Sequence, residues 1–322
     1  MEETEIGINK YDLWQDYLSS AIPGIVFGLA ITVVTIIVDP GFLSLIESSA
    51  LSAMPLAFLG IAEIFVLSTG NVDLSAGAGL SLVNVVTVAA FTDYGIGGPL
   101  LLFIPLGMGL IIGFINGVLV GYIRLNSFLA TIATTSVWSG AALFVMSEPR
   151  GNVPGWFTEL FQEGIVGIPS FVWLILLAVI IWLIFRFHSI SNHFFAAGSD
   201  AESAFATGIN VPRIRFYSFL LNGLMIGFAG LIMCGAITSG DPGVGDPLTL
   251  TAIIAALIGG GVFAGGEGSG IGVIGGAIGL GFMRNLIFFL GVSSFHQDLV
   301  YSSIIVALMV ILIYVRRKGI LG

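Results

Sequence analysis

The sequence has little of what soluble enzymes and nucleic-acid-binding proteins are built from. Only 9% of its 322 residues are charged, whereas a soluble domain carries roughly a quarter. Its net charge of −9 argues against nucleic-acid binding, because that binding depends on clustered Lys and Arg side chains. Lys10 and Lys318 are its lysines, and neither stands in a Gly-Lys-Ser/Thr sequence. This chain therefore has no Walker A loop with which to hydrolyse ATP.

Cysteine and catalytic motifs are also scarce. Cys234 is the one cysteine, so an intrachain disulfide is excluded, no metal cluster is indicated, and a small packed residue is the simplest interpretation. The sequence has no HExxH, GxSxG or Cys/His cluster, and its three His are scattered. A G-x-G-x-x-G match at residues 270–275 lies in an apolar run without a βαβ context. We expect no enzyme activity, no metal and no cofactor in this chain.

What the chain does have is apolar sequence. Hydrophobic residues make up 57% of it, and the mean hydropathy is +1.07. Several apolar runs approach or exceed the roughly 20 residues that cross a bilayer as a helix, and they lack the alternation of a membrane barrel. The sequence predicts an all-α polytopic membrane protein with about ten transmembrane helices. The predicted spans are residues 22–38, 50–68, 75–92, 99–122, 127–146, 168–187, 216–238, 249–264, 270–290 and 298–315.

Residues 1–20 are polar and aromatic, and they predict a short helix lying along the membrane interface. Their acidic character does not resemble a cleaved signal peptide. Residues 21–322 are expected to form a single transmembrane domain. Lys and Arg gather in alternate loops, which places both termini and residues 188–215 in the cytoplasm. The basic residues on that side are Arg124, Arg186, Arg213, Arg215, Arg316, Arg317 and Lys318, and Arg150 is the exception on the other side.

Residues 188–215 form a polar island between two apolar runs. Ser199 is a candidate N-cap for a helix over residues 199–206, whose first turn carries Asp200 and Glu202. Gly208 suits the position after the helix, and Pro212 prevents its continuation. The pattern predicts a short helix outside the bilayer, on the cytoplasmic side.

Glycines recur at four-residue spacing, which indicates close helix packing. They are Gly113/Gly117/Gly121, Gly223/Gly227 and Gly275/Gly279. Two Gly-rich breaks, each with one acid, follow the second and eighth spans and form a weak internal echo. Such paired interruptions are typical of a transport pathway, and a packing origin is equally open. For the two acids, Asp73 and Glu267, we favour a structural role at helix starts.

Polar residues inside or near the spans are expected to face the bundle interior or water, because lipid exposure is costly. They are Glu63, Asp73, Asn84, Asn116, Asn222 and Arg284. For Arg284, a lining role in a pathway and a simple pairing with an acid or carbonyls both stand.

Four motifs resemble bacterial ABC-transporter permeases of the ribose/simple-sugar type. Residues 71–77 (NVDLSAG) resemble the family's G-x-I-D-L-S-x-G signature, and residues 197–211 resemble its cytoplasmic A-x-G-x-N-x-x-A-A-x-x-x-G-I-N-V loop. Residues 259–268 resemble its G-G-T-S-L-A-G-G-x-G element, and residues 291–297 its G-V-S-S-x-x-Q element. The matches occur in order from about residue 60 to residue 300 and together are specific.

The resemblance implies the inner-membrane subunit of an importer that moves a simple sugar or similar small polar solute by alternating access. Two permease chains, identical or paralogous, would form the pathway. Separate ATPases would bind ATP and Mg²⁺, and a periplasmic or lipoprotein binding protein would deliver the substrate. The cytoplasmic helix would be the coupling helix that contacts the ATPase. The coupling residues implied are Gly198, Ser199, Asp200, Ala201, Glu202, Ala204, Gly208 and Asn210.

Further candidates follow from interpreting the chain as such a permease. The pathway residues are Asn126, Phe128, Thr131, Asn222 and Arg284. The structural or gating residues of the Gly-rich turns are Asn71, Asp73, Ser75, Gly265, Gly266 and Glu267. The chain departs from the family at residues 249–251 (TLT, where E-L-D is frequent) and at Arg284, where Asn is common; an Arg there would suit an anionic or strongly hydrogen-bonding ligand. A secondary carrier or channel is the alternative, and a membrane enzyme is a distant third.

Overall fold

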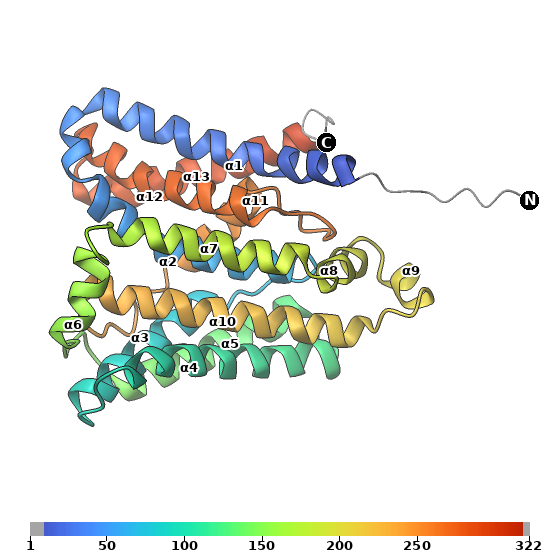
Figure 1. The fold of residues 1–322 in the computed structure, drawn as a ribbon, viewed down its shortest axis with the longest axis horizontal. Helices are drawn as coiled ribbons and strands as arrows, with labels where there is room; N and C mark the ends of the chain where they lie inside the picture. Colours follow the sequence, from blue (N-terminus) through green and yellow to red (C-terminus); the bar gives the residue numbers. More distant parts are fainter. Residues whose placement is uncertain (1–9, 318–322) are drawn as a thin grey trace, which may run out of the picture.

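The structure, a computed structural model, describes residues 10–317, which fold into a bundle of helices without a β-strand (Figure 1). A 3₁₀ turn (Pro40–Ser44) precedes α2, and π-helical turns follow α4 (Val118–Tyr122) and α6 (Glu159–Glu163). The α-helices are α1 (Lys10–Val38), α2 (Ile46–Leu67), α3 (Ala76–Thr92), α4 (Leu100–Gly117), α5 (Ser127–Val145), α6 (Gly155–Thr158), α7 (Ser170–Phe187), α8 (Ile190–Ser199), α9 (Ala201–Ala206), α10 (Val211–Ile237), α11 (Leu248–Ile258), α12 (Gly270–Phe289) and α13 (Ser294–Arg317).

Eight helices of the described chain are long and apolar enough to cross a membrane, so the all-α, multi-pass prediction is confirmed. They are α1, α2, α4 with its π-helical turn, α5, α7, α10, α12 and α13. The other two predicted spans are the shorter apolar helices α3 and α11. The span predicted over residues 249–264 is too long, because α11 stops at Ile258 where Gly259, Gly260 and Gly261 begin, and Gly260 has a φ of +95°.

The predicted interfacial helix of residues 1–20 is not a separate element where the structure describes it. From Lys10 onward these residues form the first turns of α1, which continues through Pro23 to Val38. No glycine or proline stands between Lys10 and Pro23 to end the helix. Residues 1–9 and Lys318, whose position was also predicted, lie outside the described residues.

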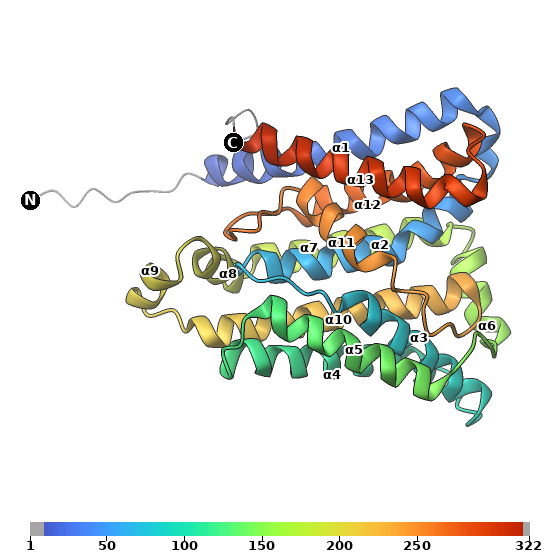
Figure 2. The ribbon, with the colours of Figure 1, turned by 180° about the vertical axis from the view of Figure 1, so that it is seen from behind.

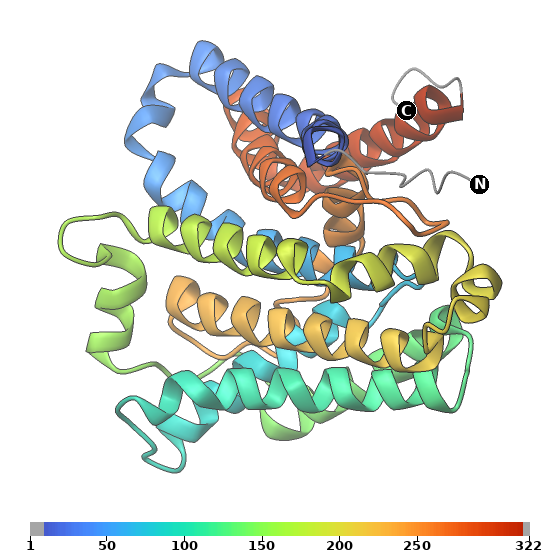
Figure 3. The same cartoon turned by 45° about the vertical axis from the view of Figure 1, so that its right-hand side comes forward.

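Helix α2 lies at the centre of the bundle. It is mostly apolar, and 94% of its most apolar stretch is buried, against 6% for α13 at the periphery. On one side α2 packs against α12, which in turn packs against α1; on the other it packs against α10, which packs against α4 (Figure 3). Side chains that face outward on α1, α5 and α13 suit contact with lipid, as expected for outer helices.

The glycine repeats allow these helices to approach closely. A Cβ on Gly113 would overlap Phe219 O and lie 2.9 Å from Gly223 Cα, and a Cβ on Gly275 would lie 2.7 Å from Gly24 O. Gly227 and Gly279 are similarly close to neighbouring helices. The expectation of close packing from these repeats is confirmed.

The two ends of the bundle differ. The described start of α1, the last turns of α13 and the pair α8–α9 all lie at one end, whereas α6 lies at the other (Figures 1 and 2).

Candidate translocation and coupling site

The connection between α2 and α3, residues 68–75, leaves helical geometry inside the bundle; we call it the first break. Backbone N–H groups exposed by such a break need partners, because water cannot supply them there. Helix α5 supplies two hydrogen-bond acceptors for these N–H groups: Ser127 Oγ accepts from Val72 N at 3.3 Å, and Thr131 Oγ1 accepts from Leu74 N at 3.0 Å. Thr135 Oγ1 donates to Leu74 O at 2.9 Å. The hydroxyl face of α5 thus fixes the first break in place.

Two carboxyl groups meet at the first break, and both are fully buried. The backbone N–H of Asp73 donates to Glu63 Oε2 of α2 at 3.4 Å. Asp73 Oδ1 accepts from Ser75 N at 2.8 Å and from Ser75 Oγ at 2.7 Å. Asn116 of α4, also fully buried, donates from Nδ2 to Ser75 Oγ at 2.8 Å. Helix α2, the first break and α4 therefore build one polar cluster in the apolar core.

Asp73 was expected to cap α3, but its carboxylate binds Ser75. Gly77 N in the first turn of the helix donates to Thr249 Oγ1 of α11 at 3.1 Å. The N-cap of α3 is Ser75, whose side chain makes no capping bond. Asp73 instead holds the turn just before the helix. Asn71, the other polar residue of this motif, is nearly buried and donates to Thr69 O at 3.0 Å. The residues of the motif are therefore brought together, with Asp73 and Ser75 at its centre.

The connection between α11 and α12, residues 259–269, is the second break. Ser269 is the N-cap of α12 and accepts from Gly272 N at 3.4 Å, while Ser269 N donates to Gly259 O at 3.1 Å. The expectation that Glu267 caps this helix is wrong: its side chain is exposed, and it lies two residues before the N-cap position. The serine is the better cap because its short side chain reaches the free N–H groups.

The two breaks touch each other, and the end of α8 touches both. Gly266 N donates to Ser68 O at 3.1 Å. A Cβ on Gly198 would overlap Ser68 O and lie 2.6 Å from Gly266 N, and a Cβ on Gly265 would lie 2.8 Å from Gly198 Cα. We call Gly70, Gly198, Gly265 and Gly266 the glycine junction. The two breaks, which are weakly similar in sequence, are thus also in physical contact.

The coupling segment, residues 188–215, contains two short helices where one was predicted. The N-cap of α9 is Asp200 and not Ser199, which is the last residue of α8. Asp200 Oδ1 accepts from Glu202 N at 3.0 Å and from Ser203 N at 3.2 Å. The Ser203 hydroxyl and these N–H groups lower the pKa of Asp200. Ser199 does not cap α9, because it is still the last residue of α8, where its hydroxyl donates back to Phe195 O at 3.0 Å.

The end of the coupling segment follows the prediction closely. Gly208, with a φ of +89°, stands two residues after α9, in the conformation that glycine adopts most readily. Asn210 N-caps α10 by accepting from Arg213 N at 3.1 Å. Pro212 stands in the first turn of α10, where proline is well tolerated.

The predicted coupling residues differ in exposure. Ser199, Asp200, Glu202, Gly208 and Asn210 are exposed, Gly198 and Ala201 are partly buried, and Ala204 is buried against the protein. Phe205, which the sequence argument missed, is 70% exposed at the tip of α9. A large aromatic side chain in a short helix predicted to lie outside the bilayer was the available signal. Beside it lies a hollow of about 740 Å³, lined among others by Arg124, Glu202 and Phe205.

The five predicted pathway residues do not form one group. Thr131 and Asn222 are fully buried, and neither polar atom of the Asn222 side chain has a protein partner. Asn126 is exposed and N-caps α5, and Phe128 is 52% exposed. Of the two interpretations of Arg284, the structure supports pairing with an acid: its side chain is half exposed, 3.6 Å from Asp298 and 4.5 Å from the centre of the Tyr301 ring.

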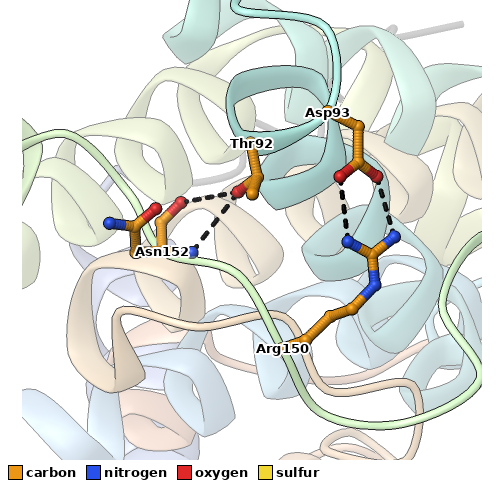
Figure 4. Close-up of polar contacts among 4 residues, drawn as sticks. All are labelled: Thr92, Asp93, Arg150 and Asn152. Carbon is orange, nitrogen blue, oxygen red and sulfur yellow. Dashed lines mark hydrogen bonds and ion pairs between the residues drawn. The ribbon is translucent and has the colours of Figure 1, made fainter.

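At the opposite end of the bundle, the segment after α5 is tied to the end of α3 (Figure 4). Arg150 forms two bonds to Asp93, at 2.9 and 2.8 Å. Thr92 Oγ1 donates to Asn152 O at 3.2 Å. The hydrogen bonds from Arg150 lower the pKa of Asp93. This bidentate ion pair accounts for Arg150, the exception among the basic residues at this end of the bundle.

Comparison with known proteins settles the class of the molecule. Residues 45–314 match the family described as branched-chain amino acid transport system / permease component. The chain belongs to this family. It is therefore a membrane permease component of a transport system, and its family is not one of enzymes. No group of three or more His, Cys, Asp or Glu in the described chain is arranged to hold a metal ion.

Several curated permeases are similar to this permease over most of its length. It is 32% identical to the probable ABC transporter permease protein y4mJ of Sinorhizobium fredii, over 82% of this chain and 80% of the relative. It is 31% identical to the ribose import permease protein RbsC of Bacillus subtilis, over 88% and 90%. It is 28% identical to the galactose/methyl galactoside import permease protein MglC of Haemophilus influenzae, over 87% and 90%. No solved structure matches the chain.

Proposed function

We propose that this permease is the membrane subunit of an ATP-driven importer that moves a simple sugar or a similar small polar solute across the cytoplasmic membrane. The names of its relatives, which include ribose and galactose import permeases, support this substrate class. The absence of a Walker A loop from the sequence requires that ATP and Mg²⁺ be bound by a separate ATPase.

The observation that carries the proposal is the position of the coupling segment. Helix α9 stands at one end of the bundle with Phe205 exposed, and the preceding helix α8 ends in the glycine junction against both breaks. A partner that pushes or pulls on α9 would therefore move the two irregular segments that reach into the bundle. This is the arrangement expected of a helix that receives work from an ATPase and transmits it to a pathway.

The proposed topology has ten crossings, with α3 and α11 added to the eight longer helices. Its support is that the described ends of α1 and α13 lie at the same end of the bundle as α8 and α9 (Figures 1 and 2). The basic residues of that end favour the cytoplasm. Residues 21–322 then form one transmembrane domain, two copies of which, or this chain and a paralogue, would enclose the pathway and receive substrate from a binding protein outside.

Transport would proceed by alternating access. Among the candidate pathway residues, Thr131 and Asn222 have the strongest support, because both are fully buried and Thr131 binds the first break. We add Asp73 and Asn116, each of which keeps a buried oxygen atom without a protein partner. Such atoms suit the hydroxyl groups of a polar solute when the bundle opens.

The docking role of α9 is tested at its exposed aromatic residue. We expect Phe205→Glu to reduce co-purification of the ATPase subunit at least about tenfold, because a charge replaces a buried anchor in the complex. Phe295→Glu is the matched control, since Phe295 is 89% exposed at the start of α13, at the other end of the bundle. Equal co-purification of the ATPase with wild type and Phe205→Glu would refute docking at α9.

The energy source separates this proposal from a secondary carrier. Proteoliposomes that contain the permease, its ATPase and its binding protein should take up labelled solute only when ATP is supplied on the ATPase side. Uptake that persists without the ATPase and follows an imposed proton gradient would establish the alternative class.

A further inference from the structure

The carboxyl pair at the first break has no basic partner. Two ion pairs occur in the part of the chain that the structure describes, Arg150–Asp93 and Arg284–Asp298, and neither involves Glu63 or Asp73. Helices α3, α4, α5 and α11 contain no charged residue. The basic residues on the other helices packed against α2 lie toward the helix ends: Arg186, Arg213, Arg215 and Arg284.

Two ionised carboxylates would be very costly in this position. Each costs several kcal/mol to bury without compensation, and their mutual repulsion in a medium of low dielectric adds to that cost. Both side chains are fully buried in the described structure. At least one positive charge must therefore accompany the pair, from a proton or from a metal cation.

The polar atoms that lack a hydrogen-bond partner distinguish a proton from a metal cation. Glu63 Oε1, Asp73 Oδ2 and Asn116 Oδ1 are buried without a protein partner. All three are acceptors, and Asn116 has already committed its amide nitrogen to Ser75. A single proton bound to one carboxyl oxygen turns that acceptor into a donor. This donor can then hydrogen-bond to a second of the unpartnered oxygens. The three oxygens that lack a protein partner are fewer than the roughly six to eight oxygen ligands that a Ca²⁺ ion takes.

The same contacts assign the proton to one of the two acids. Asp73 Oδ1 accepts two short bonds from Ser75, which stabilise its ionised form. Glu63 receives one long bond, at 3.4 Å, from the Asp73 backbone. We propose that Glu63 and Asp73 form a buried proton-binding site, in which Glu63 is a neutral carboxylic acid and Asp73 carries the charge. A neutral Glu63 can donate to the free oxygen of Asp73, which links α2 to the first break.

This inference does not depend on the transported solute or on the ATPase, so it is tested on the purified permease alone. Infrared spectra of the protein in nanodiscs at neutral pH should contain the carbonyl-stretch band of a protonated, buried carboxylic acid. The band should disappear in Glu63→Gln and persist in Glu267→Gln, because Glu267 is exposed. Absence of this band from the wild type would overturn the proposal, and its loss in Asp73→Asn but not in Glu63→Gln would overturn the assignment to Glu63.

Stability gives a second, independent measurement. Glutamine is close in shape to neutral glutamic acid, so Glu63→Gln should unfold within a few degrees of the wild type, whereas Glu63→Ala should unfold markedly earlier. A Glu63→Gln protein that fails to fold, or that is as unstable as Glu63→Ala, contradicts a neutral Glu63. A bound metal cation is the competing explanation: it would make the unfolding temperature of the wild type rise with NaCl, KCl or CaCl₂ relative to choline chloride, and this result would also refute the proposal.

Discussion

The two breaks are similar in sequence but differ in how they are held. The first break is largely buried, and side chains of α2 and α5 accept hydrogen bonds from its backbone. Asn116 of α4 donates to the hydroxyl of Ser75, which in turn donates to the acid of this break, Asp73. In the second break, Glu267 faces solvent, and the contacts that position the segment are mainly between backbone atoms and glycines. One break is fixed by directed hydrogen bonds inside the core, and the other by close backbone packing at its edge.

This difference suggests a division of labour within the proposed mechanism. Directed hydrogen bonds specify one geometry, which suits a polar cluster in the middle of the bundle. Backbone contacts between glycines can slide or separate at lower cost, which suits a joint between moving elements. The first and second breaks contact each other at the glycine junction, and the end of α8 packs against both there.

The largest effect should come from exchanging the acids of the two breaks for alanine. Asp73→Ala leaves the buried Ser75 N–H and hydroxyl without their acceptor, and we expect a loss of about 3 kcal/mol in unfolding free energy. Glu267→Ala removes an exposed side chain and should change the stability by less than about 0.5 kcal/mol. Denaturant unfolding of both variants in one detergent checks this contrast. Equal losses would mean that the two breaks are held alike.

A smaller loss is expected on the α5 side of the first break. Thr131→Val removes the acceptor of the Leu74 N–H inside the bundle, which should cost about 2 kcal/mol. Thr134→Val is the matched control, because the Thr134 hydroxyl donates only to a carbonyl of its own helix, Thr131 O. The same unfolding assay compares the two. A Thr131→Val protein as stable as the control would show that α5 does not fix the break.

The smallest effect concerns the far end of the bundle. The pKa of Asp93 is lowered by its hydrogen bonds from Arg150, so the pair contributes stability above the ordinary aspartate range. That contribution is lost as the pH falls through the lowered pKa of the folded state. Asp93→Asn should therefore unfold slightly earlier than the wild type at neutral pH and equally at the lowest pH tolerated. A difference that does not shrink on acidification would exclude this pair as its source.

Much of the fold followed from the sequence, because membrane spans and their loops leave strong signals. Residues 168–187 and 270–290 correspond closely to α7 and α12. The long apolar run ended earlier than predicted at α11, where three consecutive glycines outweigh apolar character. The N-cap of α9 was missed by one residue, because Ser199 and Asp200 are both good caps and the bend after α8 decides between them.

The candidate site was less accessible to sequence reasoning. Glu63 and Asp73 were recognisable as costly residues in apolar surroundings, but their contact depends on how the first break folds back on α2. For Arg284 the sequence left a pathway role and pairing with an acid both open, and the structure pairs it with Asp298 and places it over the Tyr301 ring. Phe205 was overlooked because aromatic residues are common in this chain. Which side of a helix faces the core is decided by tertiary packing and not by local pattern.

The most direct test of the central claim, that α8 passes motion to both breaks, is the amount of solute imported per ATP hydrolysed by Gly198→Ala in proteoliposomes. A Cβ at this position overlaps Ser68 O, so we predict that the variant retains its ATPase and hydrolyses ATP but imports at least about tenfold less solute per ATP. Gly140→Ala, a helical glycine with open space around it, should behave like the wild type. Unchanged import per ATP in Gly198→Ala would contradict the account.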